Sequence, residues 1–191
     1  MTEDKFLDGY FEQYRSLLIS DQIKSDIRAF ADLARSVRER GSKMMFAGNG
    51  ASASISEHGA VDFTKQARVR GVTFHDPNLI TCFANDFGYD HWVAKAIEHY
   101  GDADDVVVLI STSGQSPSVV NAAHAARKMG LTVVTFTGRS ADNPLRLMGD
   151  INFWAPSDAY NVCENLHSIW LTATVDLVIG KSEYETRAYS L

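Results

Sequence analysis

Apolar residues in the first forty positions recur at the three- and four-residue spacing of amphipathic helices. One apolar stripe runs from Phe6 to Leu18 and a second from Ile23 to Val37. Ser20 or Asp21 is suited to cap the second helix. A helix with one apolar stripe needs a cover, so these residues, 1–40, are expected to form a helical extension that packs on the domain or on another subunit.

From residue 43 the pattern changes to short apolar runs that alternate with helical stretches. Strands that are apolar without alternation are covered on both faces, and a β-α-β-α order gives a parallel, doubly wound sheet. The sequence therefore predicts an α/β fold, with one domain over residues 1–191. The expected strands are 44–47, 72–74, 106–110, 133–136 and 151–154, with helices near 52–66, 91–99, 117–129, 143–148 and 160–180.

Ligands of such sheets bind outside the carboxyl ends of the strands. This rule selects three loops, residues 48–54, 75–90 and 111–116, as the places to look for a site. The polar tail Lys181–Leu191, which follows Gly180, is expected to be loosely held.

Composition excludes several classes of partner. The net charge is -6 and lysines and arginines are scattered, which argues against a nucleic-acid partner. No apolar run approaches the roughly 18 residues of a membrane span, and the first residues lack the regions of a signal peptide. Cys82 and Cys163 have no metal-type spacing and are expected to be buried thiols in a reducing cytoplasm.

The strongest chemical signal is the segment Ser111-Thr112-Ser113-Gly114-Gln115-Ser116, called here the serine turn. It follows an apolar strand and precedes a helix that Pro117 begins and Ser116 is placed to cap. Four hydroxyls and the free N–H groups of a helix start suit a dianion without help from lysine or arginine. The serine turn therefore predicts a binding site for a phosphate ester.

The loop Gly48-Asn49-Gly50 also joins a strand to a helix. It matches neither a Walker A nor a dinucleotide-binding loop. It is therefore either a plain turn or a loop whose glycines let the backbone come close to a ligand. His58 and Asp62 lie four residues apart on the helix that follows. That spacing places them on one helix face, where they form either a solvated polar face or a pair for metal binding or proton transfer.

Two further segments carry polar residues near the expected ligand edge. Asn85 and Asp86 precede Gly88 and are either a turn signal or ligands for sugar hydroxyls. Glu164 stands near the start of the last, mostly apolar helix. It is either a polar contact of the site or a favourable charge at a helix N-terminus.

Taken together, these motifs resemble the SIS (sugar isomerase) domain family, and within it the phosphoheptose isomerases. The resemblance covers nearly the whole chain. It implies a five-stranded parallel sheet flanked by helices, in a homotetramer with sites at subunit interfaces. It also implies an aldose–ketose isomerase, an intramolecular oxidoreductase that converts sedoheptulose 7-phosphate to D-glycero-D-manno-heptose 7-phosphate for heptose-containing glycans.

The resemblance also assigns roles to residues. Asp62 and Glu164 would act in catalysis, and His58, Asp62 and Glu164 would hold zinc or another divalent metal, with no organic cofactor. The residues expected to bind the phosphorylated sugar are Asn49, Gly50, Ala51, Ser52, Asn85, Asp86, Ser111, Thr112, Ser113, Ser116 and Glu164.

Three positions depart from the family pattern. Thr172 stands where the family has its second catalytic histidine, Asp62 stands for a glutamate, and Glu164 stands for a glutamine. His167 lies about 140° around the helix from Thr172 and cannot replace the missing histidine. The alternative function is therefore a non-catalytic sugar-phosphate-binding protein, like the family relative that associates with the replication initiator DnaA.

Overall fold

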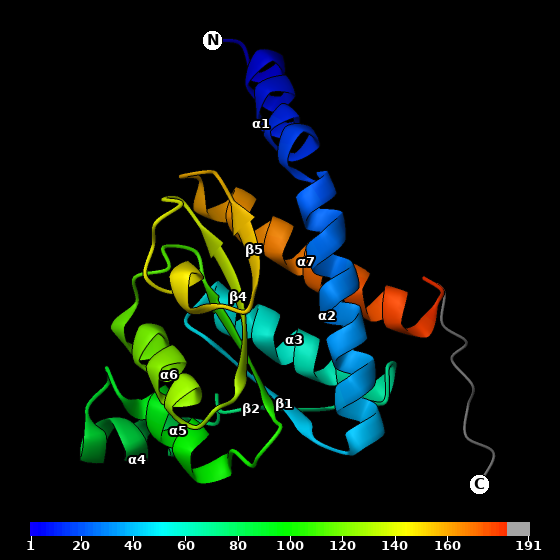
Figure 1. Ribbon diagram of the computed structural model, residues 1–191. Coiled ribbons are helices and arrows are strands. Elements are labelled where there is room, and N and C mark those ends of the chain that lie inside the picture. Colours follow the sequence, from blue (N-terminus) through cyan, green and yellow to red (C-terminus); the bar gives the residue numbers. More distant parts are fainter. Residues whose placement is uncertain (183–191) are drawn as a thin grey trace, which may run out of the picture.

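Five strands form one fully parallel sheet in the order β2-β1-β3-β4-β5 (Figure 1). The computed structural model describes residues 1–182, so residues 183–191 of the tail expected to be loose lie outside the described residues. The sheet confirms the predicted α/β class and its five strands. The strands are β1 (Lys43–Gly48), β2 (Arg70–Thr73), β3 (Val106–Ser111), β4 (Thr132–Gly138) and β5 (Ile151–Ala155).

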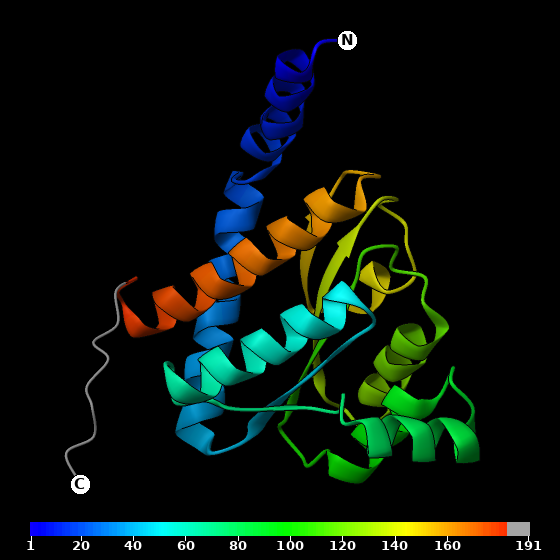
Figure 2. The same cartoon turned by 180° about the vertical axis from the view of Figure 1, so that it is seen from behind.

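Helices cover both faces of this sheet. On one face lie α2 (Asp21–Arg40), α3 (Ala51–Lys65) and α7 (Tyr160–Ile179), and on the other α5 (Trp92–Tyr100) and α6 (Pro117–Lys128). Viewed from behind, α3 and α7 run beside each other (Figure 2). Their close approach depends on Gly59, because a Cβ there would lie 2.5 Å from Leu171 Cδ2.

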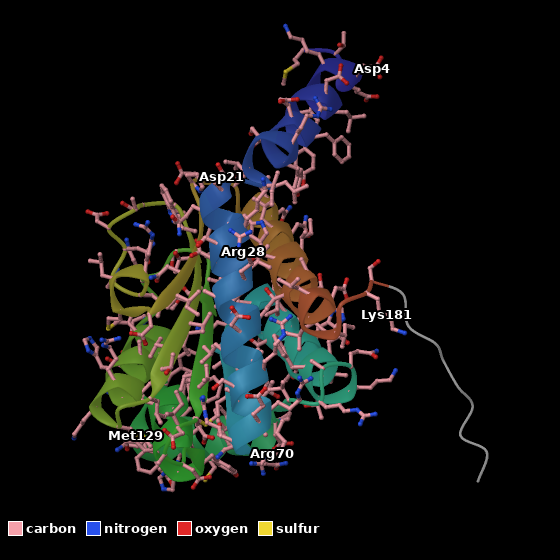
Figure 3. All side chains as sticks on the ribbon, turned by 45° about the vertical axis from the view of Figure 1, so that its right-hand side comes forward. Asp4, Asp21, Arg28, Arg70, Met129 and Lys181 are labelled. Atoms are coloured by element: carbon pink, nitrogen blue, oxygen red, sulfur yellow. The ribbon has the colours of Figure 1, made fainter. Side chains whose placement is uncertain are left out.

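The first helix, α1 (Glu3–Leu17), stands away from the rest of the molecule, with Asp4 near its free end (Figure 3). None of its residues is buried, and the side chains of Phe6, Leu7 and Phe11 are exposed. The helix is held at its end, where Asn165 Nδ2 donates to the hydroxyl of Tyr14 at 2.8 Å. Within residues 1–182, Tyr10, Tyr14 and Leu17 of the predicted stripe pack partly against the core, whereas Phe6 and Leu18 at its two ends are exposed.

The prediction of a loop over residues 75–90 is wrong for most of that segment, which forms α4 (Pro77–Phe87). Asp76 starts this helix by accepting hydrogen bonds from the N–H groups of Asn78 and Leu79. The opposite error occurs at residues 143–148. There the expected helix is only a 3-10 turn, η1 (Arg146–Met148), which stops at Gly149, where the backbone is extended.

Both cysteines are free, as expected, but only Cys163 is buried. Cys82 is exposed because it lies on α4, which buries none of its residues. Within residues 1–182, no helix combines the length and the apolar character that crossing a bilayer requires.

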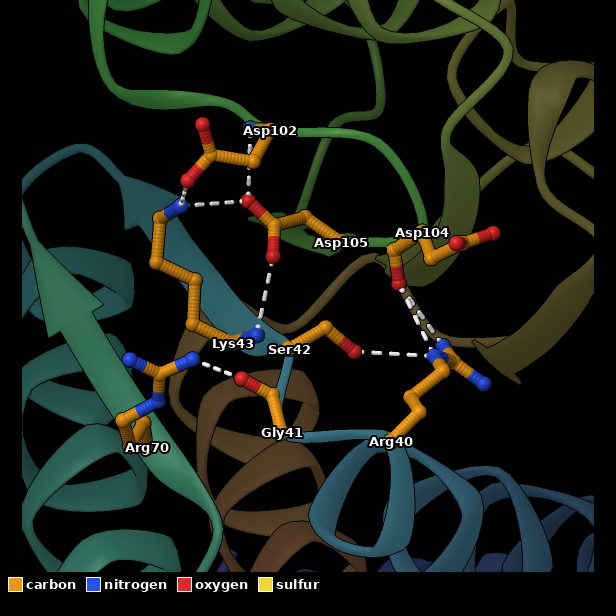
Figure 4. Close-up of polar contacts among 8 residues, drawn as sticks. All are labelled: Arg40, Gly41, Ser42, Lys43, Arg70, Asp102, Asp104 and Asp105. Carbon is orange, nitrogen blue, oxygen red and sulfur yellow. Dashed lines mark hydrogen bonds and ion pairs between the residues drawn. The ribbon is translucent and has the colours of Figure 1, made fainter.

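An ion-pair network fixes the amino ends of β1 and β3 (Figure 4). The buried carboxylate of Asp105 accepts hydrogen bonds from the backbone N–H groups of Lys43 and Asp102, each at 2.8 Å. The ammonium of Lys43 lies 2.5 Å from Asp105 and 2.7 Å from Asp102. These contacts lie at the end of the sheet opposite to the predicted ligand loops.

Candidate functional site

A cavity of about 260 Å³ opens where β1 and β3 end side by side. The chain passes from β1 to β2 on one side of the sheet and returns to β3 on the other, so the loops after β1 and β3 diverge. Crevices at such switch points are the usual ligand sites of doubly wound sheets. The cavity is lined by Asn49, Gly50, Ser52, Ile110, Ser111, Thr112, Ser113, Ser116, Tyr160 and Glu164.

The serine turn supplies most of the hydroxyl groups in this cavity. Thr112 is buried, and its Oγ1 has no hydrogen-bond partner within the described residues. Ser116 occupies the expected N-cap position of α6, but its hydroxyl makes no capping bond and instead accepts from Ser111 Oγ at 3.3 Å. The N–H groups at the start of α6 are therefore available to an anion, and the buried Thr112 hydroxyl beside them has no competing partner.

Gly114 lets the serine turn close tightly. Its φ is +63°, a left-handed conformation that favours glycine, and a Cβ there would collide with the side chain of Asn143. Asn143 is buried and donates from Nδ2 to Ser140 O at 2.8 Å, and the N–H of Leu145 donates to Gly114 O at 3.1 Å. The segment after β4 thus holds the turn in place.

The loop after β1 forms the opposite wall. Gly50 adopts a φ of +57°, and Asn49 donates from Nδ2 to Ser118 Oγ at 3.0 Å while accepting from Tyr89 Oη at 3.1 Å. Beneath the loop, His75 Nε2 lies 3.1 Å from Gly48 O, and burial lowers the pKa of this histidine. Ala51, also expected to contact the sugar, does not line the cavity.

Glu164 and Tyr160 reach the cavity from the first turns of α7. Glu164 is half-buried, and burial raises the pKa of its carboxyl group. Tyr160 was not singled out from the sequence, although its spacing of four residues from Glu164 places the two on one helix face.

His58 and Asp62 form a pair on α3, called here the α3 pair, with 3.1 Å between His58 Nε2 and Asp62 Oδ2. Neither residue lines the cavity, whereas Glu164 does. Within residues 1–182 no three His, Cys, Asp or Glu side chains gather closely enough to hold a metal ion. The metal site expected from His58, Asp62 and Glu164 is therefore not assembled within one chain, because Glu164 points to the serine turn instead.

The family has a second catalytic histidine that this chain lacks, and neither Thr172 nor His167 replaces it as an acid–base group. The Thr172 hydroxyl donates within its own helix, to Ser168 O at 3.0 Å and to Ile169 O at 3.2 Å. His167 is fully buried, with Nε2 2.9 Å from Thr137 O. Burial lowers the pKa of His167 to about 4, so the ring is neutral near pH 7.

Asn85 and Asp86 lie apart from the cavity. Both are exposed on α4, and Asn85 Nδ2 donates to Asp86 Oδ1 at 2.9 Å. Neither lines the cavity, so within one chain the expected contact with the sugar is not formed. The residue that does connect this region to the site is Tyr89, through its bond to Asn49.

Comparison with known proteins agrees with this geometry. Residues 9–138 match the family model described as SIS domain. The chain is 31% identical to the phosphoheptose isomerase of Akkermansia muciniphila over 165 residues, which is 83% of this chain and 85% of that protein. It is 29% identical to the phosphoheptose isomerase of Fusobacterium nucleatum over 171 residues, 87% of this chain and 88% of that protein.

Solved structures show the same likeness in three dimensions. A phosphoheptose isomerase from Francisella tularensis superposes with a TM-score of 0.84 at 25% identity, over 95% of this chain and all of that one. The phosphoheptose isomerase of Neisseria gonorrhoeae superposes with a TM-score of 0.82 at 25% identity, over 93% and 98% of the two chains. The chain thus belongs to the SIS domain family, within its group of phosphoheptose isomerases.

Proposed function

We propose that this protein is an aldose–ketose isomerase that interconverts sedoheptulose 7-phosphate and D-glycero-D-manno-heptose 7-phosphate. The observation that carries the proposal is the hydroxyl-lined cavity at the ends of β1 and β3, in a chain whose relatives are named phosphoheptose isomerases. The lining residues include neither lysine nor arginine, so the cavity suits a phosphate held by hydroxyls and helix N–H groups.

The serine turn anchors the substrate in this proposal. Thr112, Ser113 and Ser116 donate hydrogen bonds to the phosphate oxygens, and the start of α6 adds its N–H groups and its dipole. Asn49 and Ser52 face the carbon chain from the opposite wall. Fixing the phosphate at one end restricts where the carbonyl end can lie, which lowers the entropic cost of reaching the transition state.

The α3 pair and Glu164 perform the proton transfers. Asp62 removes the proton from the carbon next to the carbonyl, and His58 holds the Asp62 carboxylate in position through their 3.1 Å contact. The resulting enediol takes the proton back on the neighbouring carbon. Glu164, whose pKa is raised by burial, carries the proton exchanged with the substrate oxygens.

No step is assigned to a metal ion. The donors His58 and Asp62 supply at most two protein ligands, fewer than the three or four of known zinc sites. The zinc or other divalent ion implied by the resemblance would require further donors from a second subunit.

We also propose that the protein is a homotetramer, and the exposed apolar side chains of α1 are the observation that supports this. The apolar side chains of Phe6, Leu7 and Phe11 on α1 are exposed in the part of the chain that the structure describes. Burial of such a face between subunits is favourable, at about 25 cal/mol per Å². The exposed free thiol of Cys82 suits the reducing cytoplasm, where we place the activity.

Solvent exchange tests this function. Sedoheptulose 7-phosphate is incubated with the protein in D₂O, and the product is followed by NMR. Turnover should introduce deuterium at the carbon next to the carbonyl, and Asp62→Asn should abolish both exchange and turnover. Glu57→Gln, which changes an exposed carboxylate on the same helix, serves as the control and should retain activity.

Binding of the substrate with neither exchange nor turnover would contradict the proposal. It would instead support the alternative, a non-catalytic sugar-phosphate-binding protein. Binding is measured separately by thermal shift, since a ligand that binds only the folded state raises the melting temperature with its concentration.

A further inference from the structure

A second cavity lies at the β5 edge of the sheet, where the start of α2 passes beside β5 (Figure 1). It encloses about 330 Å³, which is within the range of small-molecule sites. We call it the edge cavity. None of its lining residues belongs to the cavity at the serine turn, so the two spaces are separate.

The edge cavity contains a buried carboxylate that is only half satisfied. Asp26 is 9% exposed, and its Oδ1 accepts a hydrogen bond from Gln22 Nε2 at 2.9 Å. Its Oδ2 has no partner within the described residues. Burial raises the pKa of this carboxyl group, with smaller lowering effects from Gln22 and from the charge of Arg146. A buried carboxylate oxygen without a partner is unfavourable unless something else in the cavity donates to it.

Arg146 brings an unused donor to the same space. Its Nε is buried without a partner, while its Nη1 donates to Ala141 O. The guanidinium is fixed 4.7 Å over the ring of Trp154, which also lines the cavity. Arg146 and Asp26 form no ion pair with each other. The lining of the edge cavity therefore includes one buried acceptor and one buried donor without partners, next to an aromatic wall.

The charges of these two groups restrict the ligand. The charges of Asp26 and Arg146, the two charged residues of the lining, cancel, so the cavity has no net attraction that would offset the desolvation of an ion, and a neutral molecule is favoured. It must place a hydrogen-bond donor close to an acceptor, and a hydroxyl group is both. We propose that the edge cavity is a second binding site, specific for a neutral sugar or polyol and distinct from the phosphate site.

The indole N–H of Trp154 provides a direct probe. The chain has three tryptophans, so three indole resonances are expected in a proton–nitrogen NMR spectrum. The wild-type protein, saturated with inorganic phosphate to fill the serine turn, is titrated with sorbitol, ribitol and mannose. The proposal expects a saturable shift of the Trp154 resonance, and little change at Trp92, which lies in the core on the other face of the sheet.

Variants then locate the contact. Asp26→Asn removes the charge of the free acceptor and should weaken binding about tenfold or more. Asp32→Asn, an exposed position farther along the same helix, is the matched control and should leave the affinity unchanged. Thr112→Val should also leave it unchanged, which separates the edge cavity from the phosphate site.

Three results would overturn the proposal. One is the absence of any Trp154 shift in the wild-type protein up to the solubility limit of every probe, which would mean that water alone occupies the cavity. Another is equal affinity in wild type and Asp26→Asn. The third is preferential binding of sorbitol 6-phosphate over sorbitol at the Trp154 resonance. If Asp26→Asn fails to fold, the titration of the wild-type protein still decides whether the edge cavity binds a neutral sugar or polyol.

Discussion

The two halves of the proposed active site are built in different ways. The phosphate half is one continuous segment, the serine turn, and its donors are hydroxyls and N–H groups at the start of α6. The proton-transfer half draws on two helices that are distant in sequence, with Asp62 on α3 and Glu164 on α7. The first half is complete within one chain, whereas the second does not gather around one cavity.

This difference shows that a site built from one continuous segment tolerates sequence change better than a site built from side chains on separate helices. A turn between a strand and a helix fixes its own backbone, so its donors stay aligned as long as Gly114 and the start of α6 are kept. A constellation of side chains needs the right residue at each of several positions. The departures from the family pattern, at Asp62, Glu164 and Thr172, all fall in this second half.

The sharpest way to separate the halves is Asp62→Asn, which removes the proposed base and keeps the size of the side chain. We expect kcat to fall by about 10² to 10⁴. The affinity for inorganic phosphate should not change, because Asp62 does not line the phosphate cavity. Steady-state kinetics and a phosphate titration measure the two effects. A parallel loss of phosphate affinity would show that the halves are not independent.

Acid should destabilise the fold beside the phosphate half, because the buried ring of His167 resists protonation. This ring contacts Thr137 O, and Thr137 pairs with Ser111 across the sheet. Its pKa is about 4 in the fold against an ordinary value of 6.5, so the unfolded chain binds the extra proton first as pH falls. This contribution to stability is complete above about pH 6.5 and is lost towards pH 4, about 3 kcal/mol in all.

Urea unfolding at a series of pH values measures this effect. His167→Gln should flatten the dependence of the unfolding free energy on pH within that window. The exposed residue His124 provides the control, since His124→Gln should keep the wild-type slope. Equal slopes in wild type and His167→Gln would refute the assignment.

Gly114→Ala tests whether the phosphate half depends on its backbone. The positive φ and the collision with Asn143 should lower the free energy of unfolding by about 2 kcal/mol and reduce phosphate binding. The control is Gly9→Ala on α1, where a Cβ meets nothing within 4 Å and stability should not fall. Unchanged stability and phosphate affinity in Gly114→Ala would argue against a strained turn.

The smallest expected effect concerns one hydroxyl. Thr112→Val removes the unpartnered Oγ1 and keeps the shape of the side chain, so we expect phosphate affinity to fall about tenfold with kcat nearly unchanged. Calorimetric titration of phosphate measures the change. Thr81→Val, whose hydroxyl bonds only within α4, should bind phosphate like the wild type. A normal phosphate affinity in Thr112→Val would exclude this hydroxyl from the site.

The sequence predicted the parts of the molecule that depend on local pattern. The five strands and the serine turn follow from short apolar runs and from neighbouring residues, and each lies within two residues of its expected bounds. The sequence pattern does not predict helix α4, because the Asn and Asp near its end are typical of a turn, although Asp76 marks its start as a capping residue. That error also placed Asn85 and Asp86 nearer to the site than they are.

Features that depend on packing could not be predicted. Asp26 occupies an ordinary position on an amphipathic helix, and only the approach of Arg146 and Trp154 turns it into part of a cavity. The absence of a three-donor metal group among residues 1–182 likewise depends on where Glu164 points. Spacing along one helix cannot determine distances between helices.

The network of Lys43, Asp102 and Asp105 has a consequence for how such a protein can evolve. It pairs the buried carboxylate of Asp105 with the mostly buried ammonium of Lys43 at the end of the sheet that faces away from the ligand, while the exposed Asp102 is a second partner of Lys43. Losing one partner of a buried pair is strongly destabilising, so that end tolerates little change. The serine turn at the opposite end relies on hydroxyls and backbone N–H groups. A substitution among these groups breaks no buried ion pair, so the chemistry of a lineage can change while its scaffold stays the same.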